Sequence, residues 1–317
     1  MLAVSQRYYF KHYREMVAEV KQIPIEREYA KNPSISPEDI SRLREWLWTQ
    51  PHLPADQFND LDLMLAYHSC ERSMEVTKQV FDLHYTLRTV LTPYFKDRRL
   101  EPKIDRAINT VLYAPLPLPT VHGHRALFLR IEDPDVRNFN LQDIARTFMM
   151  VLDLWQYEEG TWPGCVLIMD LEKMSFGHIG KLEVNTVRDI LYFIQECLFV
   201  RLREVHFVNA PHFMDTIMML LKPFMKKSLM DMINIHLPKS DTIYKFVPKQ
   251  AFPREEGGDH KDHKTINEEL LERLYSNQEF FKRENLRRVN EALRPGGKSK
   301  LEDQFGIQGS FKKLDID

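Results

Sequence analysis

The stretch Arg203–His236, REVHFVNAPHFMDTIMMLLKPFMKKSLMDMINIH, decides the fold of this chain. Alternating apolar residues predict a buried strand at 205–208, which Asn209 ends, and Pro211 suits the first turn of a helix. From 212 to 225 the chain is apolar on almost every side, so this helix is either buried or faces lipid. It is too short to span a bilayer, which needs about 20 apolar residues.

The end of this helix is basic. Lys226 and Lys227 follow it directly, and apolar bulk beside lysines is typical of a helix at a membrane interface. A core helix with a solvated basic end fits the same residues equally well. The residues by themselves leave both interpretations open.

Three ordered motifs carry a family resemblance. The strand and helix above lead into Lys-Pro-Phe at 222–224. A glycine-led strand with an Asp-Leu turn occupies Gly164–Leu171 (GCVLIMDL) before His178, and a proline-rich segment with paired glycines occupies Val247–Gly258 (VPKQAFPREEGG). Together they resemble the CRAL-TRIO lipid-binding family, in its arthropod members similar to alpha-tocopherol transfer protein. The resemblance implies a lipid pocket closed by a mobile gate helix.

From residue 122 onward, strands alternate with helices. Strands that are apolar on both faces predict an α/β fold, with a mostly parallel sheet covered by helices. We place a small all-helical bundle domain at 1–95, the CRAL-TRIO domain at 96–262, and a C-terminal helix and tail at 263–317. The predicted strands are 126–131, 165–169, 205–208 and 233–236, with helices at 140–157, 178–198 and 212–225.

Capping signals and prolines predict where helices and loops begin and end in the N-terminal and C-terminal regions. A helix is predicted over 11–22, and prolines predict an extended loop over 94–118. A capping box at Thr265 starts the last helix, and the tail over 298–317 is expected either to pack back as a strap or to be disordered. Ser36 with Pro37 and Asp39 starts one N-terminal helix, and Ser73 starts another whose inward face is Val76, Val80, Leu83 and Leu87.

Composition narrows the class of protein. The 317 residues carry 44 basic and 46 acidic side chains, and a net charge of −2 gives no argument for nucleic-acid binding. We see no signal peptide and no run long enough for a membrane span. Cys70, Cys165 and Cys197 lack metal-binding spacing and indicate reduced thiols. We expect a cytoplasmic monomer with transient membrane association, no cofactor and no nucleic-acid partner.

Signals for catalysis are weak. The chain has neither a Gly-x-Ser-x-Gly elbow nor a Gly-x-Gly-x-x-Gly turn after a strand. Asp170 ends a central strand, where active sites of α/β sheets lie, but its motif gives it a structural turn role. His178 and His206 fit hydrogen-bonded structural histidines better than a base or a ligand. We therefore expect a protein that is not an enzyme.

A polar loop offers the one candidate metal site. His260 and His263 alternate there with Asp259 and Asp262. Exposed polar loops of this kind are far more often only solvated, and we assign no metal.

We predict an apolar ligand pocket between the sheet and the helices. Burying a lipid tail there is favourable by about 25 cal/mol per Å² of apolar area, without any chemistry. Opening exposes the gate helix, which is tolerable only against a membrane, so opening is coupled to membrane contact. The predicted pocket residues are Phe128, Phe148, Trp155, Val166, Ile168, Val187, Ile190, Ile194, Phe207, Phe213, Ile217 and Leu221, and the predicted gate residues are Phe213, Met214, Ile217, Met218, Leu221, Phe224 and Met225.

Basic residues flank the gate on both sides. Arg201 and Arg203 precede its strand, and Lys226 and Lys227 follow its helix, so we predict that both pairs meet at one mouth. Such a cluster attracts phosphoinositide headgroups, although an ordinary charged surface explains it equally well. In the tocopherol-transfer branch, basic residues match at Arg201 and Arg203, whereas two further basic positions fall on Ser228 and Met232.

Our interpretation is a carrier that binds one hydrophobic lipid and exchanges it at membranes. A tocopherol, a retinoid or carotenoid, a terpenoid and a phospholipid are all compatible with the pocket. The alternative is a phosphoinositide-sensing adaptor without cargo. A hydrolase working at Asp170 and His178 is the weakest alternative.

Overall fold

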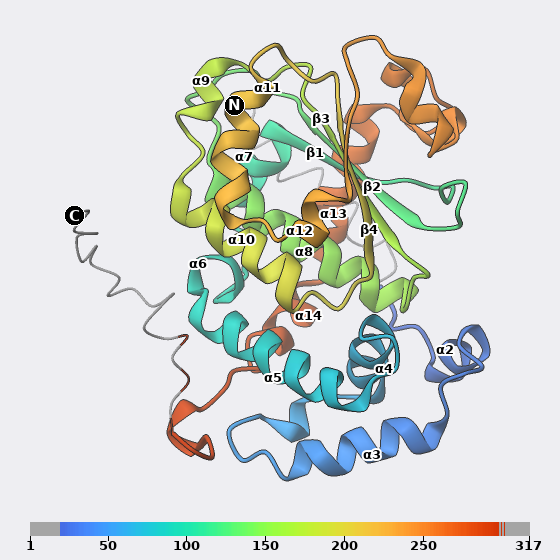
Figure 1. Ribbon diagram of the computed structural model, residues 1–317, viewed down its shortest axis with the longest axis vertical. Coiled ribbons are helices and arrows are strands. Elements are labelled where there is room, and N and C mark those ends of the chain that lie inside the picture. Colours follow the sequence, from blue (N-terminus) through green and yellow to red (C-terminus); the bar gives the residue numbers. More distant parts are fainter. Residues whose placement is uncertain (1–19, 298, 300, 302–317) are drawn as a thin grey trace.

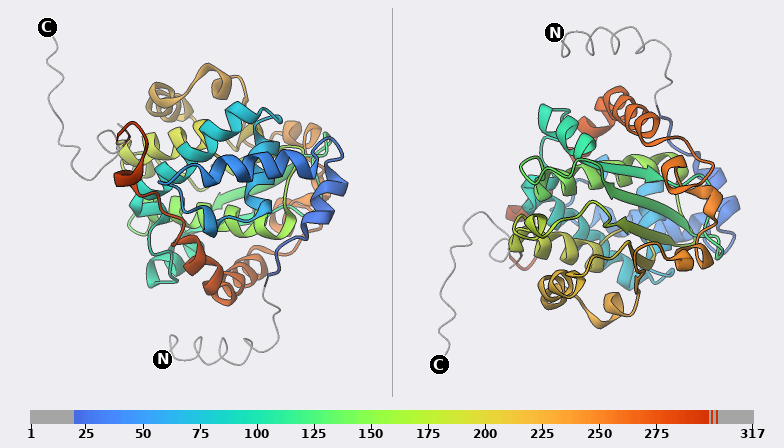
Figure 2. Two further views of the ribbon diagram at one scale, coloured as in Figure 1. Left: turned by 90° about the horizontal axis from the view of Figure 1, so that it is seen from below. Right: turned by 90° about the horizontal axis from the view of Figure 1, so that it is seen from above.

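The computed structural model describes residues 20–297, 299 and 301, and it shows a sheet domain above a layer of N-terminal helices (Figure 1). The helix predicted over 11–22 and the tail predicted over 298–317 lie largely outside the described residues. Seen from above, the sheet lies between helices on both sides (Figure 2). The predicted α/β fold with a helical N-terminal region is confirmed.

Five strands form one sheet in the order β1-β2-β3-β4-β5. Strand β1 runs antiparallel to β2, and the other neighbours are parallel, which confirms the mostly parallel prediction. Parallel neighbours need long crossovers, and helices supply them. The strands are β1 (Val111–Pro115), β2 (Arg125–Ile131), β3 (Cys165–Asp170), β4 (Leu202–Val208) and β5 (Ile233–Ile235).

The crossovers carry the helices that the apolar periodicity predicts. Asn140 caps the first of them, because its side chain accepts a hydrogen bond from the Asp143 N–H at 2.8 Å. The predicted helix at 178–198 is instead two helices, because Ser175 and His178 cap each other around a single short turn before the chain starts again. The crossover helices are α8 (Leu141–Glu159), α9 (Phe176–Ile179), α10 (Val184–Glu196), α11 (Met214–Leu221), η2 (Lys222–Phe224) and α12 (Lys227–Met230).

The two faces of the sheet pack against different partners. Leu127 and Leu167 pair across β2 and β3 and pack against helices α8 and α10. Their neighbours Phe128 and Ile168 point the other way, because side chains alternate along a strand. That second face is covered by the segment that carries Val247 and Phe252. Its short helices are η3 (Asp241–Lys245), η4 (Lys249–Ala251) and η5 (Arg254–Glu256).

The prediction of an extended loop over 94–118 is wrong. The region contains α6 (Thr92–Phe95), α7 (Pro102–Thr110) and the edge strand β1. Pro102 occupies the first turn of α7, where a missing N–H costs nothing, and Pro115 ends β1 at the sheet edge. The prolines therefore mark the ends of these elements.

The N-terminal helices follow their capping signals. The Ser36 hydroxyl accepts from the Asp39 N–H at 3.2 Å, and the Asp39 carboxylate accepts from the Ser36 N–H at 3.0 Å. Val76 was predicted to face inward but is 45% exposed, and Phe81 with Tyr85 fills the interior instead. The helices are α2 (Ile25–Lys31), α3 (Pro37–Trp48), η1 (Ala55–Gln57), α4 (Asp60–Ser69) and α5 (Met74–Val90).

The C-terminal helices tie the two regions together. Asp262, and not Thr265, caps the first of them, because the Asp262 carboxylate accepts from the Thr265 N–H at 2.8 Å. Beyond them, the chain runs down along α5 (Figure 1), where Arg287 forms a forked pair with Asp62 at 2.8 and 2.9 Å. The elements are α13 (His263–Ser276), α14 (Gln278–Glu284) and η6 (Glu291–Leu293). The domain boundaries at 95 and 262 remain predictions.

Candidate functional site

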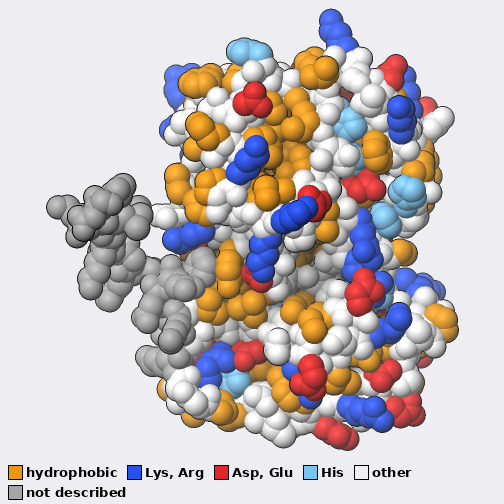
Figure 3. Space-filling model, in the orientation of Figure 1, with side chains coloured by type: hydrophobic (Ala, Val, Ile, Leu, Met, Phe, Trp, Pro, Cys, Tyr) orange, Lys and Arg blue, Asp and Glu red, His pale blue; other side chains and the backbone are white. Residues whose placement is uncertain are grey.

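Helix α11 lies over β4 with one apolar face inward. Met214, Ile217 and Met218 are buried against Val205 and Phe207 of that strand. On the outer side Met219 is 66% exposed, and Figure 3 shows hydrophobic side chains gathered over this helix with Lys and Arg side chains nearby. The helix is shorter than the predicted 212–225. The predicted gate residues Phe213, Leu221, Phe224 and Met225 are half-buried around it.

The N-terminal end of α11 is held by a polar turn. Asn209 adopts a left-handed conformation (φ 52°), and its amide donates to the Asp170 carboxylate at 2.9 Å. The same carboxylate accepts from Arg130 at 2.6 Å and from the Glu172 N–H at 2.9 Å. Asp170 therefore fixes the turn before the gate, in agreement with the structural role predicted for it.

The C-terminal end of α11 is held by Gln195 of α10. The Gln195 amide donates to the carbonyl of Phe224 at 2.9 Å and accepts from the Lys226 N–H at 2.7 Å. These bonds pin the backbone where η2 ends. Gln195 is not predicted from the sequence, because a glutamine on a surface helix carries no signal of its tertiary partner.

The helix-facing side of the sheet collects most of the predicted pocket residues. Phe207 and Ile217 share one apolar cluster, with Phe213 and Leu221 packed at its edge. Half-buried Met169, Leu191 and Leu202 lie in the same cluster and were not predicted. The remaining predicted residues on this side, all from helices, are Phe148, Trp155, Ile190 and Ile194 in the adjoining cluster and the buried Val187.

Three predicted pocket residues lie on the wrong side of the sheet. Phe128, Val166 and Ile168 belong to the opposite cluster, under the 243–252 segment. In the register of β3 and β4, Met169 is paired with Phe207, so Ile168 must point away from it. These three side chains cannot line one pocket with Phe207. The prediction failed because an apolar strand buried on both faces does not reveal which face meets the gate.

A groove of about 310 Å³ opens beside the start of β4. Arg201 and Arg203 line it together with Glu71, which binds the two guanidinium groups at 3.2 and 3.1 Å. Burial and the charge of Arg201 lower the pKa of His68 to about 4, so this neighbour adds no charge at neutral pH. The groove therefore offers two cations that share one carboxylate.

The predicted lysines lie next to this groove and do not line it. Lys226 is paired with Glu196, which is one of the lining residues, and Lys227 is paired with Asp231 at 2.7 Å. Both lysines are exposed. The single mouth predicted for all four basic residues thus divides into an arginine groove with Lys226 at its rim and an outlying Lys227.

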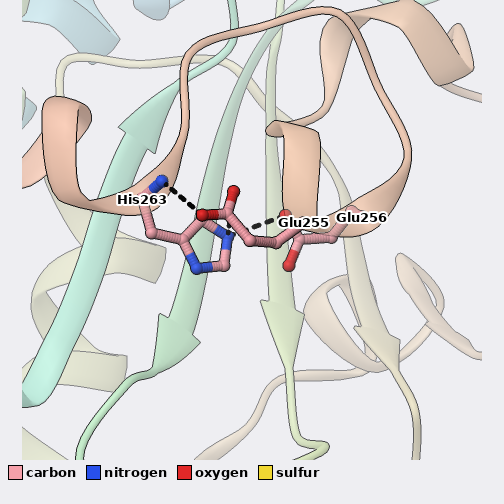
Figure 4. A group of neighbouring side chains, drawn as sticks. All are labelled: Glu255, Glu256 and His263. Carbon is pink, nitrogen blue, oxygen red and sulfur yellow. Dashed lines mark hydrogen bonds and ion pairs between the residues drawn. The ribbon is translucent and has the colours of Figure 1, made fainter.

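A histidine and two glutamates have the spacing of a metal site (Figure 4). His263 Nε2 lies 2.8 Å from Glu256, its backbone N–H donates to Glu255, and its Nδ1 lies 3.2 Å from Glu132. Burial alone would lower the pKa of His263, but Glu132 and Glu256 raise it to about 9. At neutral pH both ring nitrogens therefore carry protons, and the imidazolium itself is the cation of this cluster.

Within the described part of the chain, no helix is long and apolar enough to cross a membrane.

Two family models match separate parts of the chain. Residues 113–258 match the family model described as CRAL/TRIO domain, and residues 32–103 match the one described as Pinta-like, UBA domain. Clavesin-1 of Xenopus laevis is 23% identical over 233 residues, which are 73% of this chain and 70% of that protein. Clavesin-2 of Homo sapiens is 22% identical over 73% of this chain and 71% of its own length.

Among solved structures, the crystal structure of Sfh5 aligns with a TM-score of 0.41 at 11% identity, covering 67% of this chain and 76% of that one. Likeness at this level supports no conclusion. The placement in the tocopherol-transfer branch stays a prediction, and neither matched family model describes a catalytic domain. Residues 113–258 of this chain are therefore a CRAL/TRIO domain.

Proposed function

We propose that this protein carries one hydrophobic lipid between β4 and helices α10 and α11, and exchanges it at membranes by moving α11. CRAL/TRIO domains bind lipids, and the chain has this domain. The observation that carries the proposal is the attachment of α11. Its inner face is apolar and rich in methionine, and the side-chain bonds from Asp170 and Gln195 reach the chain on either side of it, at Asn209 and at 224–226.

Methionine makes this contact adaptable. Met214, Met218 and Met169 are unbranched and polarisable, so they repack around a ligand more easily than branched side chains. A lipid tail entering here would take over contacts that α11 now makes with Phe207. Each Å² of apolar area kept from water contributes about 25 cal/mol, so contacts with the lipid would offset the contacts that α11 gives up.

The outer surface supports membrane contact during exchange. Phe176 of α9 is 63% exposed and packs edge-on against Phe213, with ring centroids 5.8 Å apart. Met219 of α11 is also largely exposed, and it lies beside Lys222 and Asp215. An apolar patch with adjacent lysine suits an anionic membrane. We propose that the carrier acts as a monomer in the cytoplasm and contacts membranes transiently.

Phosphoinositide recognition is the second part of the proposal. Guanidinium groups bind phosphate oxygens in a forked geometry, and among the described residues Arg201 and Arg203 share Glu71 as their one ion-pair partner. A headgroup phosphate would displace Glu71, which is largely exposed. An adaptor that senses this headgroup without carrying cargo is the competing function, and the same groove favours it.

The decisive experiment is mass spectrometry of an organic extract from protein purified gently from its native source. We expect one stoichiometric lipid, lost in Ile217→Asp because a carboxylate beneath the gate is incompatible with an apolar ligand. Leu118→Asp is the matched control, since Leu118 is exposed in a loop outside this cluster. Empty protein that still binds phosphoinositide vesicles through Arg201 would favour the adaptor.

A further inference from the structure

A chain of hydrogen bonds runs from the surface to the sheet beside the gate. His206 of β4 lies with Nε2 2.9 Å from the Glu204 carboxylate and Nδ1 2.9 Å from Nε2 of His236. His236 Nδ1 lies 2.7 Å from the Thr242 hydroxyl, which is 2.8 Å from that of Ser240. Thr242 is exposed, so solvent protons reach one end of the chain.

The two imidazoles in the middle are shielded from water. His206 is fully buried and His236 nearly so. Phe246 packs against both rings, with centroids 4.7 and 6.0 Å away. Burial lowers the pKa of His206 and of His236, and the neighbouring His206 lowers that of His236 further.

One proton arrangement satisfies every bond in the neutral chain. With Glu204 ionised, His206 donates from Nε2 and accepts at Nδ1. His236 then donates from Nε2 to His206 and accepts from Thr242 at Nδ1. Each donor faces an acceptor, so the neutral pair is stable in its buried position.

Added protons act in two steps. The first proton reverses the direction of the hydrogen bonds between the rings and Thr242. His206 becomes an imidazolium beside Glu204, and His236 now accepts at Nε2 and donates from Nδ1 to Thr242. A second would set two N–H groups and two positive charges against each other at 2.9 Å. Doubly charged, the pair must separate.

Few charges face the pair from neighbouring elements. Strand β3 presents Ile168 in register with His206, and the segment after β5 presents Thr242 and Phe246. In the β1–β2 loop, burial lowers the pKa of His124, and the nearby Glu204 carboxylate opposes that shift. Glu204 is thus the main anion that can stabilise a proton on the pair, and it also interacts with His124.

The pair lies on the face of the sheet opposite α11 and is connected to the gate through the backbone of β4. His206 lies between Val205 and Phe207, both of which pack under α11. The His236 N–H donates to the Phe207 carbonyl at 2.8 Å, and the Ala210 N–H donates to the His236 carbonyl at 3.0 Å. Separation of the two rings would therefore pull on the strand and on the turn where the gate begins.

We propose that His206 and His236 form an acid-sensitive switch that loosens β4 from β5 and frees helix α11 as pH falls. The inference rests on the proposed gate and adds its regulation. Acidic conditions, such as those next to an anionic membrane surface that concentrates protons, would favour release of the cargo. Neutral conditions keep the chain of bonds closed and the gate shut.

Hydrogen–deuterium exchange of the full chain at pH 7.5 and 5.5 tests the switch. After correction for intrinsic rates, amide exchange over 205–221 should rise about tenfold on acidification. A difference of one pKa unit between the closed and the open state corresponds to a tenfold change in the opening equilibrium. His236→Gln retains a donor toward His206 but cannot titrate, and its acid response should fall below about twofold. The control His122→Gln changes an exposed histidine and should behave as wild type.

Two results overturn the proposal: no acid response in the wild type, or a full response in His236→Gln. Should that variant fail to fold, nitrogen chemical shifts of the wild-type imidazoles decide. A first proton shared between the two imidazoles supports the switch. Two imidazoles that titrate independently, each with a pKa near 6.5, refute it. Lipid that stays bound at both pH values refutes the switch alone, whereas absence of lipid at pH 7.5 refutes the carrier function and leaves the exchange test standing.

Discussion

The joint under the gate helix and the joint between the N-terminal helices and the sheet domain are built from opposite chemistries. At the gate, α11 rests on Met214, Ile217 and Met218. At the other joint, Arg88 binds Asp153 and Glu284, in surroundings that are almost fully buried. Apolar contacts are non-directional and allow sliding, whereas a buried ion pair tolerates only one geometry. The molecule thus has one joint suited to motion and one suited to rigidity.

Breaking the rigid joint should have the largest effect. Arg88→Met removes one of the two buried charges that pair with Asp153 and Glu284 and leaves Arg98 as the cation that both carboxylates share. We expect a loss of about 3–5 kcal/mol in the free energy of unfolding, measured by urea denaturation. Arg137→Met, which removes an exposed pair with Asp135, should cost under about 1 kcal/mol. Equal losses in the two variants would mean that burial adds nothing at this joint.

Matched cavities should distinguish the two faces of the sheet. Ile168→Ala creates a cavity in the tightly packed face under Phe252, and we expect a loss of about 4 kcal/mol. Ile217→Ala lies among flexible methionines that can collapse into the space, so we expect about 2 kcal/mol. Thermal or urea unfolding measures both. A larger loss at Ile217 would contradict an adaptable gate.

Acid should weaken the rigid joint in a defined range. Arg88 and Arg98 outweigh the effect of burial and hold the pKa of Asp153 at about 2. A carboxylate with a depressed pKa stabilises the fold above its unfolded value near 4, and this contribution disappears as pH falls toward 2. Roughly 2 kcal/mol should be lost there, and Asp153→Asn should remove that part of the pH dependence. An unchanged acid slope in the variant would assign the loss to other carboxylates.

The hinge at the end of the gate should show a smaller, local effect. Gln195→Ala removes two hydrogen bonds to the backbone at 224–226, which we expect to cost about 1–2 kcal/mol. Faster amide exchange confined to 221–227 is the measurement. The exposed Gln79→Ala is the control, and uniform acceleration along the chain would instead indicate global destabilisation.

The smallest change in stability is expected on the outside of the gate. Met219 is largely exposed, so Met219→Ser should alter the free energy of unfolding by less than about 0.5 kcal/mol. Binding to vesicles that contain anionic lipid should nevertheless weaken, as sedimentation measures. Leu293→Ser, exposed in η6, is the matched control. Unchanged vesicle binding in Met219→Ser would remove this helix from the proposed membrane contact.

The sequence predicts the order of elements well and their partners poorly. Local signals, such as the cap at Asn140 and the apolar run at 165–169, depend on neighbours in the chain and were found. The side of the sheet toward which Phe128 and Ile168 point depends on which layer covers each face. A strand that is apolar throughout does not reveal this. Gln195, and the bond between His206 and His236, join positions about 30 residues apart and become visible only in the fold.

The forked pair between Arg287 and Asp62 also bears on how the chain is made. These residues are 225 positions apart, and Arg294 reaches back to Asp82 in the same way. During synthesis the N-terminal helices emerge long before these arginines, so their acidic partners wait uncompensated until most of the chain has left the ribosome. A chain cut before Glu284 would keep the whole CRAL/TRIO domain and still leave its N-terminal helices unfinished.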